Sequence, residues 1–171
     1  MGGGLDFEWL VAQHYEPLYQ FAFSLTRSEA EACDLTQQTF YVWATKGHQL
    51  REVAKVKTWL FTTLHRQFLE SRRRFTRFPH QDIETAERDL PTIAPDVSRQ
   101  LDGAQALAAL ARVDEVYQAP VALFYLQDFS YQEIATVLEV PMGTVKSRIS
   151  RGIGQLQKLM AKDISAEGTQ T

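Results

Sequence analysis

The chain has 171 residues and a formal net charge of −3, and 44% of its residues are hydrophobic and 23% charged. This composition is ordinary for a globular protein and unlike that of a disordered or membrane chain, while the length allows one large domain or two small ones. The longest apolar run, Val121 to Leu126, is too short for a bilayer, Met1 to Leu10 does not resemble a signal peptide, and Cys33 is the single cysteine. We therefore expect a cytoplasmic protein without membrane insertion or an intramolecular disulfide.

The first predicted helix covers about Asp6 to Thr26. Its apolar residues recur at helical spacing and form a wide face. This face consists of Leu10, Tyr15, Leu18, Tyr19, Ala22, Phe23 and Leu25. Pro17 lies inside the helix, and because proline has no amide donor it predicts either a kink or a break into two shorter helices.

Two further helices are predicted in the first half of the chain. Ser28 and Glu31 have the spacing of a capping box, in which each side chain binds an open amide at a helix start. They predict a second helix over about Glu29 to Lys46. A polar loop, His48 to Lys55, separates it from a third helix over about Val56 to Arg74.

Charge is distributed unevenly along the chain, and for binding partners the distribution matters more than the total. Two basic groups lie apart in the sequence: Arg72, Arg73, Arg74 and Arg77, and then Lys146, Arg148, Arg151, Lys158 and Lys162. Between them, Phe78 to Asp102 combines prolines with an excess of acidic residues, which predicts a solvated tether. We therefore expect two small helical domains joined by a flexible acidic linker.

The second half of the chain again shows helical patterns. Helix is expected to resume over Gln105 to Arg112, and Asp114 is expected to cap the next helix. Pro120 is expected to begin the rigid part of that helix, which ends near Gln127. Neither strand alternation nor an internal repeat is evident, so the predicted fold class is all-α.

A helix-turn-helix is predicted within Phe129 to Leu156. Ser130 and Glu133 form another capping box, which predicts a short helix from Tyr131 to Leu138. Pro141 ends it, and a second helix is expected to start around Gly143 or Thr144. One apolar stripe at helical spacing would face the core of this unit, formed by Val145, Ile149, Ile153, Leu156 and Met160.

The opposite side of this second helix carries small and basic residues that suit a DNA groove. Hydrogen-bonding side chains there would read base edges at about 1–3 kcal/mol per bidentate pair, and cations would anchor phosphates. The residues expected to contact DNA are Thr144, Lys146, Ser147, Arg148, Ser150 and Arg151, with Arg148 at the flank. The alternative is an ordinary surface helix with solvated cations, but the capping box, turn, stripe and basic face together favour DNA binding.

Catalytic and metal-binding patterns are absent from the sequence. The four histidines, His14, His48, His65 and His80, are far apart, and none pairs with a cysteine at metal-ligand spacing. There is no phosphate-binding loop, and the paired carboxylates are better explained as charges at helix starts. We expect a protein that is not an enzyme and has neither a metal nor a cofactor.

The chain resembles the extracytoplasmic-function group of bacterial RNA polymerase sigma factors over about Leu10 to Leu159. The most specific segment is SYQEIATVLEVPMGTVKSRISR, Ser130 to Arg151, which is similar to region 4 of the family. DLTQQTF, Asp34 to Phe40, and TWLF, Thr58 to Phe61, resemble region 2. The resemblance implies that region 4 binds the minus-thirty-five promoter element. It implies that region 2 docks on the polymerase beta-prime clamp helices and opens the minus-ten element.

This resemblance implies a domain organisation and a set of partners. Region 2 would span residues 5–77, the linker 78–103, region 4 104–162 and a disordered tail 163–171. The chain would bind core RNA polymerase through the beta-prime clamp helices and beta flap, bind promoter DNA and promote transcription initiation under anti-sigma control. The alternatives are a dimeric helix-turn-helix repressor or activator and a protein-binding helical scaffold.

The resemblance also implies two sites in region 2. The core-polymerase site would comprise Asp34, Leu35, Gln37, Gln38, Phe40 and Tyr41. The minus-ten site would comprise Trp59, His65, Arg66, Arg72, Arg73 and Arg74. Aromatic platforms flanked by cations can receive unstacked bases at about 1–3 kcal/mol per base, although Trp59 suits a core position equally well.

Five positions depart from the family pattern. The family usually has glutamate at Gln38, and asparagine and aspartate at Arg66 and Glu70. It often has bulkier or more helix-favouring residues at Ser150 and Gly152. Gly152, like Gly154, is expected to cost its helix about 1 kcal/mol relative to alanine.

Overall fold

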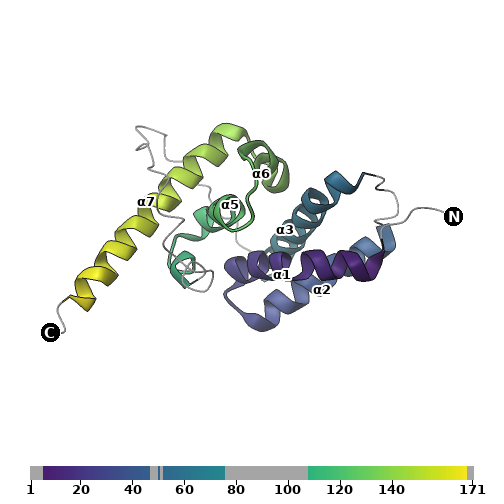
Figure 1. The fold of residues 1–171 in the computed structure, drawn as a ribbon, viewed down its shortest axis with the longest axis horizontal. Helices are drawn as coiled ribbons and strands as arrows, with labels where there is room; N and C mark the ends of the chain where they lie inside the picture. Colours follow the sequence, from purple (N-terminus) through teal and green to yellow (C-terminus); the bar gives the residue numbers. More distant parts are fainter. Residues whose placement is uncertain (1–5, 47–49, 51, 76–107, 169–171) are drawn as a thin grey trace. The chain divides into compact units, whose positions relative to one another are not determined.

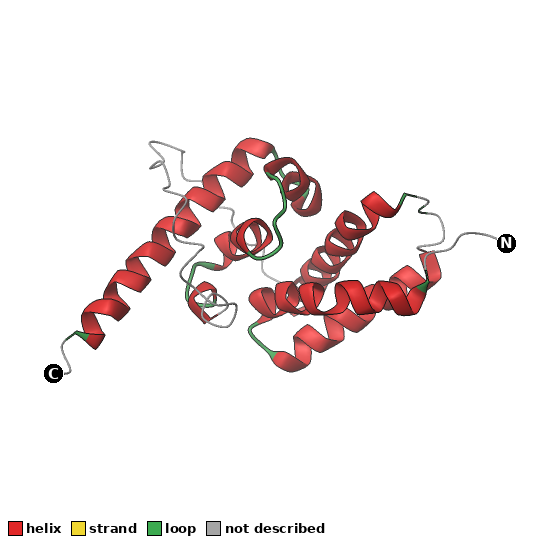
Figure 2. Cartoon of the chain, viewed as in Figure 1, coloured by secondary structure: helices red, strands yellow, loops and turns green. Residues whose placement is uncertain are grey.

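The computed structural model describes residues 6–46, 50, 52–75 and 108–168. These residues form helices, turns and loops without a strand, as Figure 2 shows, so the predicted all-α class is confirmed. None of the helices in these ranges has both the length and the apolar character needed to cross a membrane. The expected linker, residues 78–103, lies outside the described residues.

The described residues fall into two compact units, one built around α1, α2 and α3 and the other around α5 and α7. In the N-terminal unit each of the three helices packs against the other two (Figure 1). In the C-terminal unit α5 packs against α7. Two small helical domains were predicted, and the observed division agrees with them.

Helix α1 spans Phe7–Thr26 and remains one helix through Pro17, so the predicted break is wrong. The Asp6 carboxylate accepts a hydrogen bond from the Glu8 amide at 3.2 Å and caps the start. Because Leu18 on the turn after Pro17 is completely buried, packing holds the helix across the missing amide bond. Arg27, in the left-handed conformation with φ of 57°, ends the helix.

Helices α2, Glu29–Lys46, and α3, Val56–Phe75, have the predicted bounds to within one residue. The Glu31 amide donates to the Ser28 hydroxyl at 3.3 Å, as expected of a capping box. A 3-10 turn, Val53–Lys55, leads into α3 from the expected loop, of which residues 48, 49 and 51 lie outside the described part.

The core of the N-terminal unit lies between its three helices. Phe21 of α1 and Phe61 of α3 are fully buried, with ring centroids 5.4 Å apart. The sequence prediction missed Phe21. Its companions in the core include Leu10, Leu18, Ala22, Leu35, Val56, Leu60 and Leu64.

Three helices also shape the C-terminal unit: α5 spans Glu115–Tyr125, α6 spans Tyr131–Leu138 and α7 spans Met142–Glu167. The bounds of α6 are those predicted, whereas Pro120 lies inside α5 rather than at its rigid start. The expected disordered tail is wrong in part, since α7 continues to Glu167.

Candidate nucleic-acid interface

The start of the helix-turn-helix is held by a complete capping box. The Ser130 amide donates to the Glu133 carboxylate at 2.8 Å, and the Glu133 amide donates to the Ser130 hydroxyl at 3.1 Å. Glu139 ends α6 in the left-handed conformation, with φ of 58°. The Val145 amide then donates to the Pro141 carbonyl at 3.2 Å, so α7 begins directly after the proline and slightly earlier than predicted.

The apolar stripe on α7 has the predicted composition. Val145, Ile149, Ile153 and Leu156 are buried, and Met160 is half-buried near the end of the stripe. Because these residues recur every three or four positions, they face the core of the C-terminal unit along one side of the helix.

The residues predicted to contact DNA divide into two groups. Lys146 is exposed, and Thr144, Arg148 and Arg151 are half-exposed. Ser147 and Ser150 are only 4% and 7% exposed, so the prediction that they lie on an accessible face is wrong. A serine hydroxyl stays close to the helix backbone, where it is easily covered, whereas a lysine or arginine reaches outward from the same helix.

An aromatic pair lies next to the exposed lysine. The Lys146 ammonium lies 6.0 Å from the centroid of the Tyr131 ring, and Tyr131 stacks on Phe124 at 5.1 Å. Burial, followed by the nearby Tyr131, raises the pKa of the Tyr125 hydroxyl. Tyr131 was not among the residues predicted to lie at the DNA-binding surface. Its position directly after the capping serine Ser130 places it in the first turn of α6.

Gly152 permits close packing between two helices and is not simply a weak point of α7. A Cβ atom at this position would lie 2.5 Å from Val121 Cγ2 and 3.0 Å from Tyr117 Cβ, both on α5. A Cβ atom at Gly154 would meet nothing within 4 Å. The expectation of an equal cost for both glycines is therefore wrong, because at Gly152 the bare backbone allows α5 to approach.

The N-terminal unit contains an open pocket of about 430 Å³ between the C-terminal part of α2 and one side of α3. Trp59 is half-buried and lines it, with its ring edge-on to Trp43 at 5.1 Å and 78°. Trp43 is buried, so this contact joins Trp59 to the core of the unit. The lining consists of Val42, Lys46, Leu50, Trp59, Thr63, Arg66, Gln67 and Glu70. Trp59 thus lies at the edge of the core, and part of its surface is available to the pocket.

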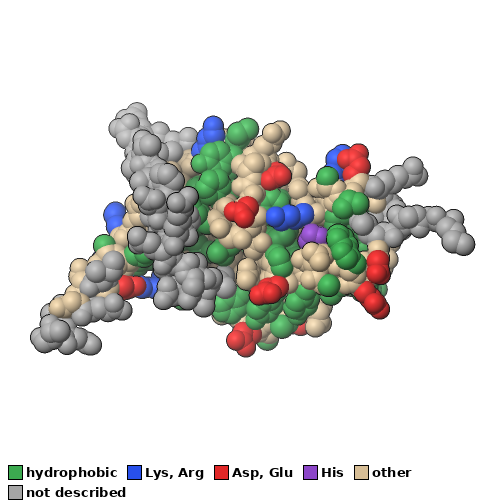
Figure 3. Space-filling model, viewed as in Figure 1, with side chains coloured by type: hydrophobic (Ala, Val, Ile, Leu, Met, Phe, Trp, Pro, Cys, Tyr) green, Lys and Arg blue, Asp and Glu red, His purple; other side chains and the backbone are tan. Residues whose placement is uncertain are grey.

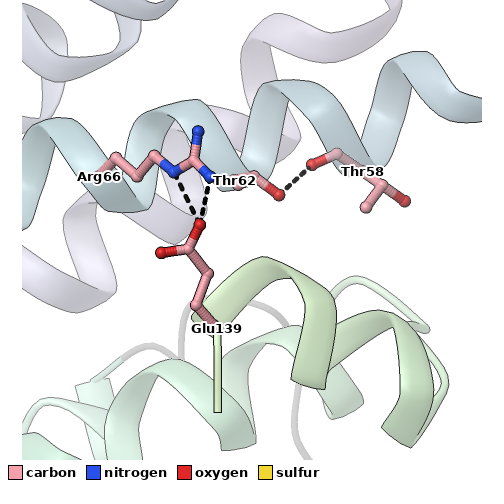
Figure 4. A network of polar contacts seen from close by, with 4 residues as sticks. All are labelled: Thr58, Thr62, Arg66 and Glu139. Carbon is pink, nitrogen blue, oxygen red and sulfur yellow. Dashed lines mark hydrogen bonds and ion pairs between the residues drawn. The ribbon is translucent and has the colours of Figure 1, made fainter.

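The remaining residues of the predicted minus-ten site lie along α3. Arg66 is exposed and belongs to the pocket lining, and Figure 4 shows it one turn beyond Thr62, whose hydroxyl donates to the Thr58 carbonyl at 2.7 Å. His65 is 9% exposed and lies 6.5 Å from the Phe21 ring, so its predicted place in a DNA site is wrong. Residue 65 follows Leu64 on the side of α3 that faces the core.

The three arginines at the end of α3 do not belong to this pocket. Arg72, Arg73 and Arg74 are exposed, and the Arg72 guanidinium lies 5.1 Å from the centroid of the Phe68 ring. Arg72 lines a second pocket of about 510 Å³. The lining of this second pocket consists of Thr26, Glu31, Asp34, Leu35, Gln38, Phe68, Ser71 and Arg72.

The predicted core-polymerase face of α2 is only partly accessible. Asp34, Gln37 and Gln38 are exposed, and Tyr41 is 71% exposed. Leu35 and Phe40 are each 5% exposed and belong to the core, so their predicted role as contact residues is wrong. Phe40 stacks on Tyr15 of α1 at 6.2 Å. The spacing 34, 37, 38, 41 marks one helix face, a signal that the sequence already contained.

Charge alone does not mark a binding surface on the face drawn in Figure 3. Acidic and basic side chains are interspersed there, and no broad patch of one sign is visible. Within the described ranges, no group of three histidine, cysteine, aspartate or glutamate side chains is arranged to hold a metal ion. The two pockets and the exposed cations of α7 are therefore the candidate sites.

Two family models match the chain, one after the other along the sequence. Residues 10–78 match the model of Sigma-70 region 2, and residues 104–156 match that of Sigma-70, region 4. The chain is 32% identical over 160 residues to ECF RNA polymerase sigma factor SigE of Mycolicibacterium smegmatis, covering 91% of this chain and 62% of that protein. It is 27% identical over 164 residues to RNA polymerase sigma factor YlaC of Bacillus subtilis, covering 94% and 95% respectively.

The chain is also similar to a solved structure of a sigma factor. The sigma factor RpoE, crystallised with the anti-sigma factor NepR from Bartonella quintana, has a TM-score of 0.70 and 28% identity, covering 91% of this chain and 97% of that one. The match of two sigma regions in chain order does not favour the dimeric repressor or activator. Since both sigma regions are present and the relatives align with most of its length, the chain belongs to the extracytoplasmic-function group of RNA polymerase sigma factors.

Proposed function

We propose that this chain is a dissociable promoter-specificity subunit of RNA polymerase in the cytoplasm. It binds core polymerase, recognises the minus-thirty-five and minus-ten elements and promotes transcription initiation without catalysing a reaction. The observation that carries this proposal is the pocket that contains Trp59. A repressor that binds only duplex DNA has no use for an aromatic pocket in a separate helical unit.

The pocket in the N-terminal unit suits an unstacked base. Its volume of about 430 Å³ and its half-buried tryptophan offer a stacking surface, and Lys46 and Arg66 on its wall offer cations to the backbone. Stacking on an aromatic side chain contributes about 1–3 kcal/mol, which offsets the few kcal/mol needed to unstack a base. In this proposal Trp59 and Arg66 contact the minus-ten element, and the exposed Arg72, Arg73 and Arg74 attract its phosphates.

Helix α7 suits the minus-thirty-five element. Lys146, Arg148 and Arg151 are the cations on its accessible side, and Thr144 is a half-exposed hydroxyl beside them. Arginine reads guanine in the major groove through two parallel hydrogen bonds, and lysine anchors phosphates as a point charge. Arg148 and Arg151 are therefore assigned to base contacts, and Lys146 to the phosphate backbone.

Core polymerase is proposed to dock on the exposed face of α2. Asp34, Gln37, Gln38 and Tyr41 lie on that face, and Asp34 and Gln38 also line the pocket of about 510 Å³. The relative from Bartonella quintana is bound to an anti-sigma factor in its crystal. By analogy, an anti-sigma factor covers part of this surface when the subunit is idle.

Run-off transcription with core polymerase, with and without the full chain, tests the proposal. Permanganate footprinting of thymines then reports whether the minus-ten element opens. Trp59→Ala is expected to abolish opening while core polymerase still binds, because the stacking surface is gone. Trp9→Ala is the matched control, since Trp9 is an exposed tryptophan of the same unit outside the pocket lining.

Two outcomes would count against the proposal. If the parent chain supports no transcription from any promoter offered in a genomic pool, it is not a sigma subunit. If Trp59→Ala folds normally and opens promoters as well as Trp9→Ala does, the base-binding pocket lies elsewhere.

A further inference from the structure

The long helix α7 has two parts with different surroundings. Its first three turns carry the exposed cations assigned to DNA, and the part from Gly152 onward packs on α5 (Figure 1). A helix is stiff over this distance, so the orientation of the second part sets that of the first. The contacts between α7 and the start of α5 are therefore relevant to DNA recognition.

Asp114 and Gln155 make a reciprocal pair of hydrogen bonds between these elements. The Asp114 amide donates to Gln155 Oε1 at 2.9 Å, and Gln155 Nε2 donates to the Asp114 carboxylate at 2.7 Å. Two bonds to one side-chain amide define its plane as well as its position. This pair therefore restricts both sliding of α7 past the start of α5 and rotation about its own axis.

Asp114 makes this pair in place of an ordinary cap. It stands at the N-cap of α5, where an aspartate normally accepts from an amide of the first turn, but its side chain makes no capping bond. The sequence prediction of a side-chain cap is therefore wrong. The Asp114 carboxylate therefore connects the start of α5 to α7 instead of capping α5.

The close approach at Gly152 strengthens this connection. Gly152 lies one turn before Gln155, and α5 fills the space that a side chain would occupy there. The Arg112 guanidinium, just before Asp114, donates to both oxygens of Asp163 at 2.9 and 3.1 Å. The second part of α7 is thus tied to the segment 112–121 at three successive places.

We infer that Asp114 and Gln155 are positioning residues for minus-thirty-five recognition, which makes this inference dependent on the proposed function. Arg148 lies about 10 Å along the axis from Gln155, and the rigid helix passes any tilt or rotation at Gln155 to it. The pair sets the angle at which the cations of α7 meet the groove. Loss of the pair therefore weakens specific binding more than non-specific binding.

A charge swap provides the test. Gln155→Glu removes the side-chain donor and places a second carboxylate against that of Asp114, so the bond between the two side chains is lost, whereas the Asp114 amide keeps an acceptor. Asp114→Asn with Gln155→Glu restores a donor facing an acceptor in the opposite sense. Asp114→Asn alone keeps an oxygen for the Gln155 amide and should behave like the parent.

A short DNA duplex is first selected from a random pool by its binding to the parent chain. The affinity of each full-length variant is then measured for this duplex and for an unselected duplex of the same length. Gln155→Glu is expected to bind the selected duplex about tenfold more weakly, within the range of coupled hydrogen-bonded pairs. The double variant should recover to within about twofold of the parent, and binding to the unselected duplex should change much less. Gln157→Glu, at an exposed position of α7, is the control for the added negative charge.

Amide chemical shifts test the positioning role of the pair independently of DNA binding, and therefore independently of the proposed function. The amides of residues 146–151 should shift in Gln155→Glu and return in the double variant, with or without DNA. If Gln157→Glu weakens binding equally, or if the swap restores neither affinity nor shifts, the positioning role is wrong. If the parent enriches no duplex, the proposed function fails, and the amide shifts still decide whether the pair positions this part of α7.

Discussion

The two units differ in how far apart in the sequence the residues of their candidate sites lie. In the C-terminal unit the capping box, the turn and the part of α7 proposed to contact DNA occupy one continuous stretch, residues 130–156. In the N-terminal unit the pocket brings Lys46 of α2 together with Trp59 and Glu70 of α3. The first site could therefore be read as a sequence motif. The second depends on how two helices pack.

The units also differ in how their helices achieve close contact. Aromatic residues fill the N-terminal unit, as in the contact of Phe21 with Phe61 and the stack of Phe40 on Tyr15. In the C-terminal unit α5 approaches α7 at Gly152, where a side chain is missing. We therefore expect the N-terminal unit to lose most stability when a buried side chain is truncated, and the C-terminal unit when a side chain is enlarged at the close contact. The three tryptophans, Trp9, Trp43 and Trp59, all lie in the N-terminal unit, so their fluorescence reports its unfolding separately.

The largest expected effect comes from truncation of Phe40. Phe40→Ala should lower the free energy of unfolding of the N-terminal unit by about 3–5 kcal/mol, because the ring is buried against α1. Urea denaturation followed by tryptophan fluorescence measures this. Tyr41→Ala, next to it and 71% exposed, should change stability by less than about 0.5 kcal/mol but should weaken polymerase binding. Equal destabilisation by both variants would contradict the assignment of Phe40 to the core.

The second effect is overpacking at Gly152. Gly152→Ala should destabilise the C-terminal unit by about 1–3 kcal/mol, because Val121 and Tyr117 leave no room for a methyl group. Gly154→Ala in the same helix should instead stabilise it by up to about 1 kcal/mol, because the space is open and alanine favours helix. Circular dichroism measures the unfolding of the C-terminal unit in both variants, while the unfolding transition seen by tryptophan fluorescence, which reports the N-terminal unit, should not change. Val121→Ala should partly rescue Gly152→Ala, and stabilisation by both glycine substitutions would contradict the close approach.

The third effect compares the two capping boxes. Ser130→Ala should cost the C-terminal unit about 1 kcal/mol, because its hydroxyl accepts from the Glu133 amide. Ser28→Ala removes a longer bond, 3.3 Å, and should cost the N-terminal unit somewhat less. Urea denaturation measures Ser130→Ala by circular dichroism and Ser28→Ala by tryptophan fluorescence. A larger loss of stability in Ser28→Ala than in Ser130→Ala would contradict the expected order of the two capping boxes.

The smallest effect concerns His14. Burial first, and then the positive charge of Lys57, lower the pKa of the His14 imidazole below its usual 6.5. The unfolded chain therefore binds more protons just below pH 6.5, and His14 lowers stability as the pH falls from 6.5 towards the folded pKa. In Lys57→Gln the pKa measured by NMR titration should rise towards 6.5. Lys55→Gln, whose ammonium pairs with Glu52 at 3.2 Å, should leave it unchanged.

Much of the fold was predictable, because helix bounds depend on local signals. The start of α6 follows from the capping box at Ser130, and that of α2 from the box at Ser28. Pro17 was overestimated as a break, and Pro120 was expected to begin the rigid part of its helix but lies inside α5. Packing of the surrounding turns compensates for one missing amide bond.

The candidate sites were predictable only where one helix contains them. The cations of α7 and the exposed face of α2 follow from residue spacing along a single helix. His65, Leu35, Ser147 and Ser150 were misplaced, because the accessible side of a residue depends on what lies beside its helix. The Trp59 pocket and the pair of Asp114 with Gln155 join residues distant in the sequence, and no local pattern predicts such contacts.

The sequence by itself determined the all-α class, the bounds of most described helices, the helix-turn-helix and the resemblance to sigma factors. Helix propensity, capping and apolar spacing act between residues at most four positions apart, so they can be read along the chain. Only the tertiary structure decided that Trp59 lines a pocket while Phe40 belongs to the core, and that Gly152 and Gln155 connect α7 to α5. These features depend on side-chain volume and hydrogen-bond geometry between helices, which are set only when the helices pack.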